Sequence, residues 1–251
     1  MKRIFLAFAA LIIGLGLTAN AFAGSFSDDQ KKELEEIIHS YLSDHPEVLR
    51  EMVIKLDAQD KKSEAAARNS ALESSAKDIY HNELDGVAGN PEGDVTIVEF
   101  MDYNCAWCRK SVKEMQSVVA SDKNVRLVLK EFPIFGEGSE YAARAAMAAA
   151  KQGKYWQLHQ ALFAVKGQVD ATVTDAVAKS VGLDMVKLKE EMKSPEVEAN
   201  IAKTHDLANA LQFTGTPGFI IGDQIFPGFI EQDTVLATIA ATRANGGCKF
   251  C

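Results

Sequence analysis

The chain has 251 residues, 47% of them hydrophobic, so it can bury a full core and has room for one domain and a smaller accessory unit. Its 35 acidic residues outnumber the 27 basic ones, which gives a formal net charge of -8 at pH 7. An acidic chain without a long basic cluster argues against nucleic acid as a partner.

The first residues have the pattern of a secretory signal peptide. Met1 is followed by a Lys and an Arg, an apolar run covers residues 4–17, and residues 21–23 read Ala-Phe-Ala. This order predicts a signal peptide over residues 1–23 and a soluble, exported mature protein. A retained membrane anchor is the alternative, but the apolar run is short for a span of about 20 residues.

Residues 24–56 are predicted to form two short amphipathic helices. Ser27 can cap the first helix, His45 lies where that helix should end, and Pro46 suits the first turn of the second. The apolar residues follow helical spacing: Leu34, Ile37, Ile38, Tyr41 and Leu42, then Val48, Leu49, Met52, Val53 and Leu56. Such helices make a poor core alone, so they pack either on the catalytic domain or on the same segment of another subunit.

Residues 57–81 have a different composition and are predicted to form a connector. Up to Lys77 the segment is rich in Ala, Glu, Lys and Ser with almost no large apolar residue, which favours an extended helix or a flexible linker. The glycines and the proline in residues 82–93 mark a domain boundary. The main domain is therefore expected over residues 82–247.

Residues 94–113 contain the candidate catalytic residues. A β-branched apolar run predicts a buried strand over residues 94–100, followed by a short loop and a helix that starts near Cys105. The unpaired N–H groups and the dipole at a helix start favour a thiolate, so Cys105 is the expected nucleophile. Cys108 lies one helical turn further on, close enough for a disulfide with Cys105, and is the expected resolving thiol.

The rest of the chain continues the α/β pattern. A second strand is expected over residues 125–132, parallel to the first through the intervening helix. Helical patterns then occupy about residues 137–213, too long an interval for an ordinary loop. The sequence returns to a hairpin over residues 218–226 and to a last helix that Asp233 and Thr234 are expected to cap.

The active stretch resembles the DsbA-like branch of the thioredoxin superfamily. The residues that carry the resemblance are Glu99, Phe100, Asp102, Tyr103, Cys105, Cys108 and Arg109. Residues 38–49 also resemble the N-terminal oligomerisation region of the suppressor-of-copper-sensitivity C proteins. Together these imply a thioredoxin-like α/β fold with an inserted helical subdomain, preceded by an N-terminal helical oligomerisation segment.

The resemblance also implies roles for residues far from the cysteines. Pro217 would be the cis-proline that faces the disulfide, leaving the backbone of Thr216 free to pair with a substrate strand beside Cys105. Glu99 would be a buried proton shuttle for Cys108. The alternative for Glu99 is a carboxylate at the sheet rim or one paired with Lys130.

The remaining candidates carry weaker signals. Trp107 offers an apolar contact for unfolded substrates or a cover for the disulfide, and Arg109 and Lys110 add positive charge or are simply solvated. Two histidines, His159 and His205, lack ligand partners at helical spacing and are interpreted as surface or packing residues.

The tail, residues 248–251, repeats the Cys-x-x-Cys spacing with Cys248 and Cys251. It fits an inert local disulfide, a clasp for copper(I) or zinc, or a second redox pair that exchanges with Cys105 and Cys108. The inert oxidised tail is the preferred interpretation, and no metal site is predicted apart from this option.

The sequence thus indicates a periplasmic thiol-disulfide oxidoreductase that acts on protein disulfides through Cys105 and Cys108, as an isomerase or reductase as well as an oxidase. It needs no cofactor besides its redox-active disulfide. The expected partners are unfolded or misoxidised exported proteins, a membrane redox partner and further copies of the chain through residues 27–56. The alternatives are a copper(I)-handling protein that uses its Cys-x-x-Cys pairs and a noncatalytic surface protein.

Overall fold

The computed structural model describes residues 26–251, so the predicted signal peptide lies outside the described residues. The described residues divide into two units, residues 26–59 and 60–251. Within the described part of the chain, no helix combines the length and the apolar character needed to cross a bilayer.

The N-terminal unit consists of helix α1 (Asp28–Asp44) and the first part of α2 (Pro46–Ser74). Ser27 begins α1 with a capping box, in which its hydroxyl accepts from the Gln30 N–H at 3.2 Å and its own N–H donates to the Gln30 side chain at 3.0 Å. His45 ends α1 and Pro46 opens α2, as the sequence predicts.

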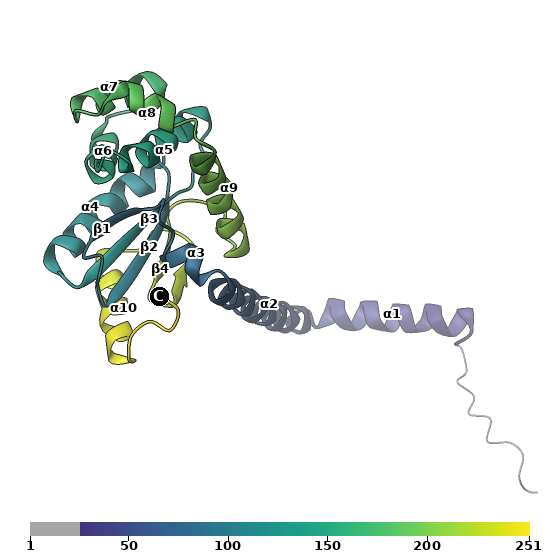
Figure 1. Ribbon diagram of the computed structural model, residues 1–251. Helices are drawn as coiled ribbons and strands as arrows, with labels where there is room; N and C mark the ends of the chain where they lie inside the picture. The colour runs from purple at the N-terminus through teal and green to yellow at the C-terminus, as the bar shows by residue number, and fades with distance from the viewer. Residues whose placement is uncertain (1–25) are drawn as a thin grey trace, which may run out of the picture. The chain divides into compact units, whose positions relative to one another are not determined.

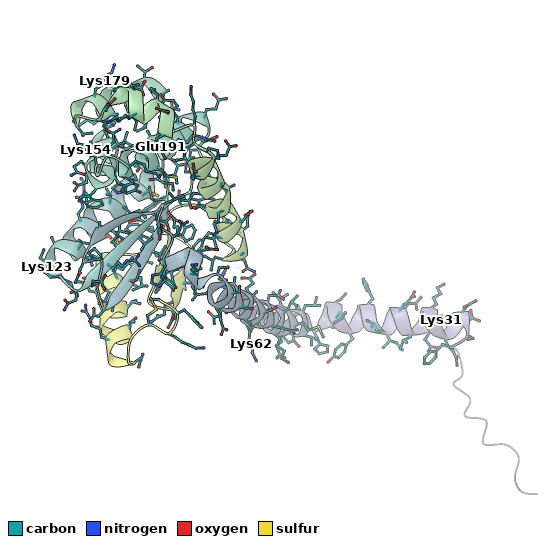
Figure 2. The ribbon with its side chains drawn as sticks, viewed as in Figure 1. Lys31, Lys62, Lys123, Lys154, Lys179 and Glu191 are labelled. Carbon is teal, nitrogen blue, oxygen red and sulfur yellow. A yellow bond between two sulfur atoms is a disulfide. The ribbon has the colours of Figure 1, made fainter. Side chains whose placement is uncertain are left out.

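The side chains of α1 project from the helix along its length, Lys31 among them (Figure 2), and none of its residues is buried. The apolar stripe of both helices is exposed. Its exposed members are Leu34, Ile37, Ile38, Tyr41, Leu49, Met52, Val53, Ile54 and Leu56. Nine large apolar side chains are thus exposed on these two helices, and large exposed apolar patches mark interaction surfaces.

The second unit is built around a five-stranded sheet in the order β1-β3-β2-β4-β5. The strands are β1 (Gly86–Gly89), β2 (Val95–Met101), β3 (Val125–Glu131), β4 (Gly218–Ile221) and β5 (Gln224–Phe226). Strands β2 and β3 are parallel, as predicted, and α4 (Ala106–Ser121) connects them. The other neighbouring pairs are antiparallel, and β4 and β5 form the predicted hairpin.

Helices occupy the interval between β3 and β4, where the sequence predicts an inserted subdomain. They are α5 (Glu137–Ala150), α6 (Tyr155–Ala164), α7 (Ala171–Ser180), α8 (Met185–Glu191) and α9 (Pro195–Ala210). Figure 1 shows α5 to α8 grouped beyond one end of the sheet, while α9 runs back along one of its faces. The last helix, α10 (Gln232–Ala244), begins with Glu231 at its N-cap, so the predicted cap at Asp233 is wrong.

Both faces of the sheet are covered, and all residues of β2 are buried. Because strand side chains alternate between faces, Ile97 and Met101 join a core with α4 and α10. Val98 and Phe100 join a second core on the opposite face. The nucleophile's helix therefore packs on one core, and the second core lies behind the sheet.

Two parts of the predicted boundary region differ from the structure. Leu72 in α2, with Ile79 and Tyr80 in α3 (Ala76–Tyr80), is buried in the second core, so the end of the predicted connector is part of the domain. The predicted boundary at residues 82–93 contains strand β1. The sequence does not reveal these elements, because neither leaves a periodic signal. The buried residues before β1 are single apolar residues in a polar run. Strand β1 has only four residues, with a glycine at each end.

Strand β1 also sets where the inserted helices lie. A Cβ atom on Gly86 would come within 1.9 Å of the ring atom Cε1 of Tyr155, in the first turn of α6. The ring of Tyr155 occupies the space that any larger residue at Gly86 would need. Its hydroxyl donates to the buried Glu131 at 2.7 Å, which fixes α6 to the end of β3.

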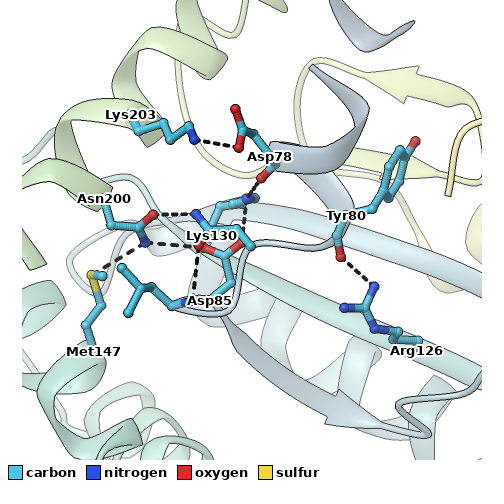
Figure 3. A network of polar contacts seen from close by, with 10 residues as sticks. Asp78, Tyr80, Asp85, Arg126, Lys130, Met147, Asn200 and Lys203 are labelled. Carbon is cyan, nitrogen blue, oxygen red and sulfur yellow. Dashed lines mark hydrogen bonds and ion pairs between the residues drawn. The ribbon is translucent and has the colours of Figure 1, made fainter. Parts of the chain in front are cut away.

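A buried ion pair lies on the opposite face of the sheet (Figure 3). Lys130 of β3 pairs with Asp85, and both side chains are almost fully buried. Lys130 also donates to the Asp78 carbonyl, and the Asn200 side chain of α9 donates to Asp85 at 3.4 Å. The network ties the segment between α3 and β1 to β3 and α9.

Candidate active site

Cys105 lies at the N-cap of α4, directly after the loop that follows β2. The backbone N–H of Cys108 donates to its sulfur at 3.3 Å, which is the helix-start contact that the sequence predicts. Both cysteines are free thiols. Cys108 is fully enclosed, and Cys105 exposes only 3% of its surface.

The pKa values of the two thiols are shifted in opposite directions. The pKa of Cys105 is lowered to about 6, first because the Cys108 side chain donates to its sulfur and then through the backbone N–H groups of Cys108 and Trp107. Burial raises the pKa of Cys108 far above its ordinary value, and the nearby Cys105 and Glu99 add to this effect. At neutral pH Cys105 is therefore a thiolate and Cys108 a thiol.

Thr216 and Pro217 reach Cys105 through the register of the sheet. Strand β4 pairs antiparallel with β2 and places Gly218 beside Phe100, so the residues before β4 lie at the end of β2 from which the cysteine loop leaves. The Thr216–Pro217 peptide bond is cis, and the Thr216 carbonyl oxygen lies 3.1 Å from the Cys105 sulfur. The structure thus brings together the residues that the resemblance pairs.

Glu99 lies in β2 on the face that packs against α4. It is buried, and the Ser111 hydroxyl of α4 donates to its carboxyl group at 2.9 Å. Burial raises the pKa of Glu99 to about 8, and the Cys105 thiolate adds to the shift. The alternative of a rim carboxylate paired with Lys130 is wrong, since Lys130 points into the opposite face and pairs with Asp85.

Trp107 is 56% exposed and packs against Phe229, with ring centroids 5.2 Å apart. Lys110 Nζ lies 4.2 Å from the Phe229 ring centroid and pairs with Glu231 at 2.9 Å. Phe229 follows β5, and no spacing in the sequence connects it with Trp107. The two rings form an apolar surface, and Trp107 lies two residues after the nucleophile.

The loop before Cys105 is held by a polar network that the sequence does not reveal. The Asp102 carboxylate accepts from the N–H groups of Ile134 and Asn104 and from the Ser139 hydroxyl, each at 2.7 Å. The Asn104 side chain accepts from the Val169 N–H at 2.7 Å and donates to the Val169 carbonyl at 3.0 Å. The inserted helices therefore position the loop that presents Cys105.

Arg109 is not merely solvated. Its guanidinium donates to the carbonyl oxygens of Phe163 at 3.1 Å and of Tyr103 and Gly167 at 3.3 Å, and it also bonds the Val165 carbonyl. These acceptors include the last carbonyls of α6, which no helical N–H can satisfy. Arg109 thus links the helix of the nucleophile to the insertion.

His159 is a packing residue, as predicted. It is enclosed by Tyr103, Tyr155, Trp156 and Phe163, and burial lowers its pKa to about 3.

The tail cysteines are joined in a Cys248–Cys251 disulfide, so in this state they offer no thiolate to a metal ion. Cys251 contacts the Gly222 carbonyl, and the Gly222 N–H donates to Thr96 near the start of β2. The seven residues of β2 span roughly 20 Å, and Cys105 follows the other end. The alternative in which this pair exchanges with Cys105 and Cys108 therefore does not fit this arrangement. Across residues 26–251, no group of three or more His, Cys, Asp or Glu side chains is placed to hold a metal ion.

Comparison with known proteins decides the family. The sequence matches the family described as DSBA-like thioredoxin domain over residues 96–240, more than half of the chain. The chain belongs to the DsbA-like thioredoxin family. Its fold is thioredoxin-like, as the sequence predicts, and members of this family are thiol-disulfide oxidoreductases that act on the thiols of substrate proteins.

The N-terminal helices match a second family, described as copper resistance protein ScsC N-terminal domain, over residues 30–62. This DsbA-like chain therefore has the domain combination that the resemblance indicated.

Solved structures agree with this assignment. A thioredoxin-like oxidoreductase from Silicibacter pomeroyi DSS-3 is 46% identical, with a TM-score of 0.66, covering 67% of this chain and 97% of that one. The catalytic domain of Proteus mirabilis ScsC is 25% identical, with a TM-score of 0.65, covering 70% of this chain and 98% of that one.

The DsbA-like domain also occurs within larger proteins. The Na(+)/H(+) antiporter NhaA 1 of Salinispora arenicola is 26% identical over 163 residues, which cover 64% of this chain and 25% of the antiporter. The chain thus spans about a quarter of the length of that relative.

Proposed function

We propose that this protein is an exported, periplasmic thiol-disulfide oxidoreductase that acts on protein disulfides, with Cys105 as the nucleophile and Cys108 as the resolving thiol. The observation that carries the proposal is the position of Cys105 at the start of α4, where hydrogen bonds lower its pKa to about 6. A thiolate at neutral pH beside a buried thiol is the arrangement that disulfide exchange requires.

The exchange proceeds in two displacements. The Cys105 thiolate attacks one sulfur of a substrate disulfide, which forms a mixed disulfide and releases the other substrate sulfur as a thiolate. Cys108 then loses its proton and attacks the Cys105 sulfur, which forms the Cys105–Cys108 disulfide and releases the second substrate thiolate. The reverse sequence oxidises a substrate dithiol.

Cys108 needs a proton acceptor for the second step, and we assign this role to Glu99. Its pKa of about 8 lets it gain and lose a proton near neutral pH. The negative charge of Glu99 also raises the pKa of Cys108, so the two groups interact. The Ser111 hydroxyl keeps the carboxyl group oriented towards α4. Glu99 would therefore take the Cys108 proton during resolution and return it during substrate oxidation.

Substrates would dock beside Cys105. The exposed ring of Trp107 and its neighbour Phe229 suit the apolar segments of unfolded or misoxidised proteins. The backbone of Thr216, which contacts the Cys105 sulfur, would pair with the substrate chain next to its cysteine. A membrane redox partner would restore the working oxidation state.

The N-terminal helices would join copies of the chain. Their apolar stripe over residues 27–56 is exposed, and the match to the ScsC N-terminal domain covers most of it. Burial of this stripe between subunits would offset the cost of ordering helices that have no core of their own. Several active sites in one assembly would favour isomerase and reductase activity besides oxidation.

The experiment compares residues 24–251 with the Cys105→Ser variant in insulin reduction and in refolding of a scrambled multi-disulfide protein. We expect the wild-type protein to perform both reactions and the variant neither. Light scattering gives the molar mass in solution of residues 24–251 and of a shorter chain, residues 60–251. We expect the longer chain to be oligomeric and the shorter one to be monomeric. An inactive wild-type protein would refute the oxidoreductase proposal, and a monomeric one would refute only the assembly.

A further inference from the structure

The tail disulfide lines a cavity at the surface of the second unit. This cavity has a volume of about 740 Å³, within the range of about 300 to 1,000 Å³ that is usual for ligand pockets. Both tail cysteines line it, together with side chains of both charges: Glu92, Asp94 and Arg126. The bridge is therefore within reach of a molecule in the cavity.

The Cys248–Cys251 disulfide contributes little to the stability of the fold. It joins residues only three apart, so it closes a very short loop and removes little entropy from the unfolded chain. The tail is held in another way, because Asp223 in the turn between β4 and β5 accepts from the N–H groups of Lys249 at 2.6 Å and Phe250 at 3.1 Å. These two bonds are donated by the backbone of the residues between the two cysteines.

The local geometry resembles that of the first pair. The Cys251 N–H donates to the Cys248 sulfur at 2.9 Å, just as the Cys108 N–H donates to Cys105 at 3.3 Å. A donor at this position stabilises negative charge on the sulfur when the bridge opens. The anchor at Asp223 keeps the two sulfurs adjacent afterwards, so the bridge can close again.

We propose that Cys248 and Cys251 form a second thiol-disulfide exchange site, which accepts electrons from peptide thiols in the adjoining cavity. The site is independent of Cys105 and Cys108, because it lies at the opposite end of β2. The proposal therefore does not rest on the activity of the first pair.

Asp223 determines which sulfur is attacked. One of its carboxylate oxygens lies 3.2 Å from the Cys248 sulfur, and this negative charge repels an incoming thiolate. The peptide thiolate attacks the Cys251 sulfur, the disulfide breaks, and its electron pair remains on Cys248. That sulfur takes up a proton from solvent, and the resulting thiol donates to Asp223.

A second peptide thiol completes the reaction. As a thiolate it attacks the peptide sulfur of the mixed disulfide, which releases Cys251 as a thiolate that solvent protonates. Two peptide thiols have then become one peptide disulfide, and the tail has become a dithiol. Two electrons and two protons have passed to the tail, so the reaction balances without a further reagent.

The first test measures whether the folded protein exchanges at this site. The full chain with Cys105→Ser and Cys108→Ser retains only the tail pair and is equilibrated with mixtures of reduced and oxidised glutathione. Acid quenching, alkylation and mass spectrometry of the tail peptide then give the reduced fraction. We expect the same fraction from the reduced and from the oxidised starting state. A bridge that stays oxidised until urea unfolds the protein would overturn the proposal.

The second test measures direction. In the same background, Cys248→Ser leaves Cys251 alone and Cys251→Ser leaves Cys248 alone, and each is treated with oxidised glutathione. We expect the adduct to form about tenfold faster on Cys251, because the full negative charge of Asp223 disfavours the Cys248 thiolate more than the single N–H of Cys251 favours it. Asp223→Asn should accelerate the reaction of Cys248. Equal rates, or a rate that Asp223→Asn leaves unchanged, would overturn the assigned direction.

Discussion

The backbone N–H of Cys108 donates a hydrogen bond to the sulfur of Cys105 at 3.3 Å. Because Cys105 is the N-cap of α4, this bond is the one that a polar N-cap side chain normally makes, with sulfur in place of oxygen. The helix start therefore selects the charged form of the nucleophile and orients it at the same time.

Removal of the Cys108 side chain should make Cys105 less acidic. The Cys108 side chain is the largest cause of the lowered pKa of Cys105, so Cys108→Ala should raise that pKa from about 6 towards the value of about 8.5 for a free thiol. Cys108→Ser keeps a donor at this position and is the matched control, with a smaller rise. The thiolate absorbance at 240 nm, followed against pH, measures both, and equal titrations of the two variants would contradict the assignment.

Glu99 should give the protein a stability that declines with rising pH. Its pKa is about 8 in the folded protein and near 4.5 when unfolded, so between these values the folded state holds a proton that the unfolded state has lost. The free energy of unfolding therefore falls as pH rises from about 4.5 to about 8.

Glu99→Gln should remove the share of this decline that Glu99 contributes, several kcal/mol, since each pKa unit is worth about 1.4 kcal/mol, while buried Glu131, whose pKa is also raised, keeps its own share. Urea unfolding at pH 5 and pH 9 measures the difference in each protein. Glu140→Gln changes an exposed carboxyl group of the same kind and should leave the decline in place. A decline in Glu99→Gln as large as that of the wild-type protein would assign it to another group.

The buried pair of Lys130 and Asp85 should be costly to break. Lys130→Met leaves the Asp85 carboxylate buried without its cation and should lower the free energy of unfolding by about 3 to 5 kcal/mol. Adding Asp85→Asn should recover part of the loss, because the uncompensated charge is gone.

The control for this pair is Lys203→Met, which removes a more exposed cation paired with Asp78 in the same network. Its effect should stay below about 1 kcal/mol. Chemical unfolding of the four proteins measures all of these values. Similar losses for Lys130→Met and Lys203→Met would show that burial of the pair does not matter.

Arg109 should stabilise the contact between α4 and the insertion. Arg109→Met leaves carbonyl oxygens at the end of α6 without their donor, and we expect a loss of about 1 to 3 kcal/mol together with faster proteolysis near residues 165–170. Lys110→Met, one residue further on, removes a surface ion pair and should cost less than about 1 kcal/mol. Unchanged proteolysis in Arg109→Met would argue against the link.

The elements that sequence reasoning found are those with a strong local signal. Strand β2 is a continuous β-branched run, the hairpin of β4 and β5 has Gly-Asp between apolar runs, and the Cys-x-x-Cys pair at a strand-to-helix junction locates the nucleophile. Strand β1 has no such signal, because it exists through its pairing with β3.

The hydrogen bonds that hold the cysteine loop could not be predicted from the sequence either. Asp102, Asn104 and Arg109 act through bonds to residues of the insertion, up to 65 positions away in the chain. Glu99 illustrates the limit, because the sequence allows both a buried acid and a partner of Lys130, and only the strand register places Lys130 on the other face. Contacts of this kind follow from the fold and leave no spacing to detect.

The close fit between Gly86 and the ring of Tyr155 makes an unremarkable edge strand intolerant of mutation. Even a single added methyl group there would wedge α6 away from the sheet and pull Tyr155 off the carboxyl group of Glu131. The insertion that supports the cysteine loop thus depends on the smallest side chain in the repertoire, at a position where the chemistry of the active site is not involved.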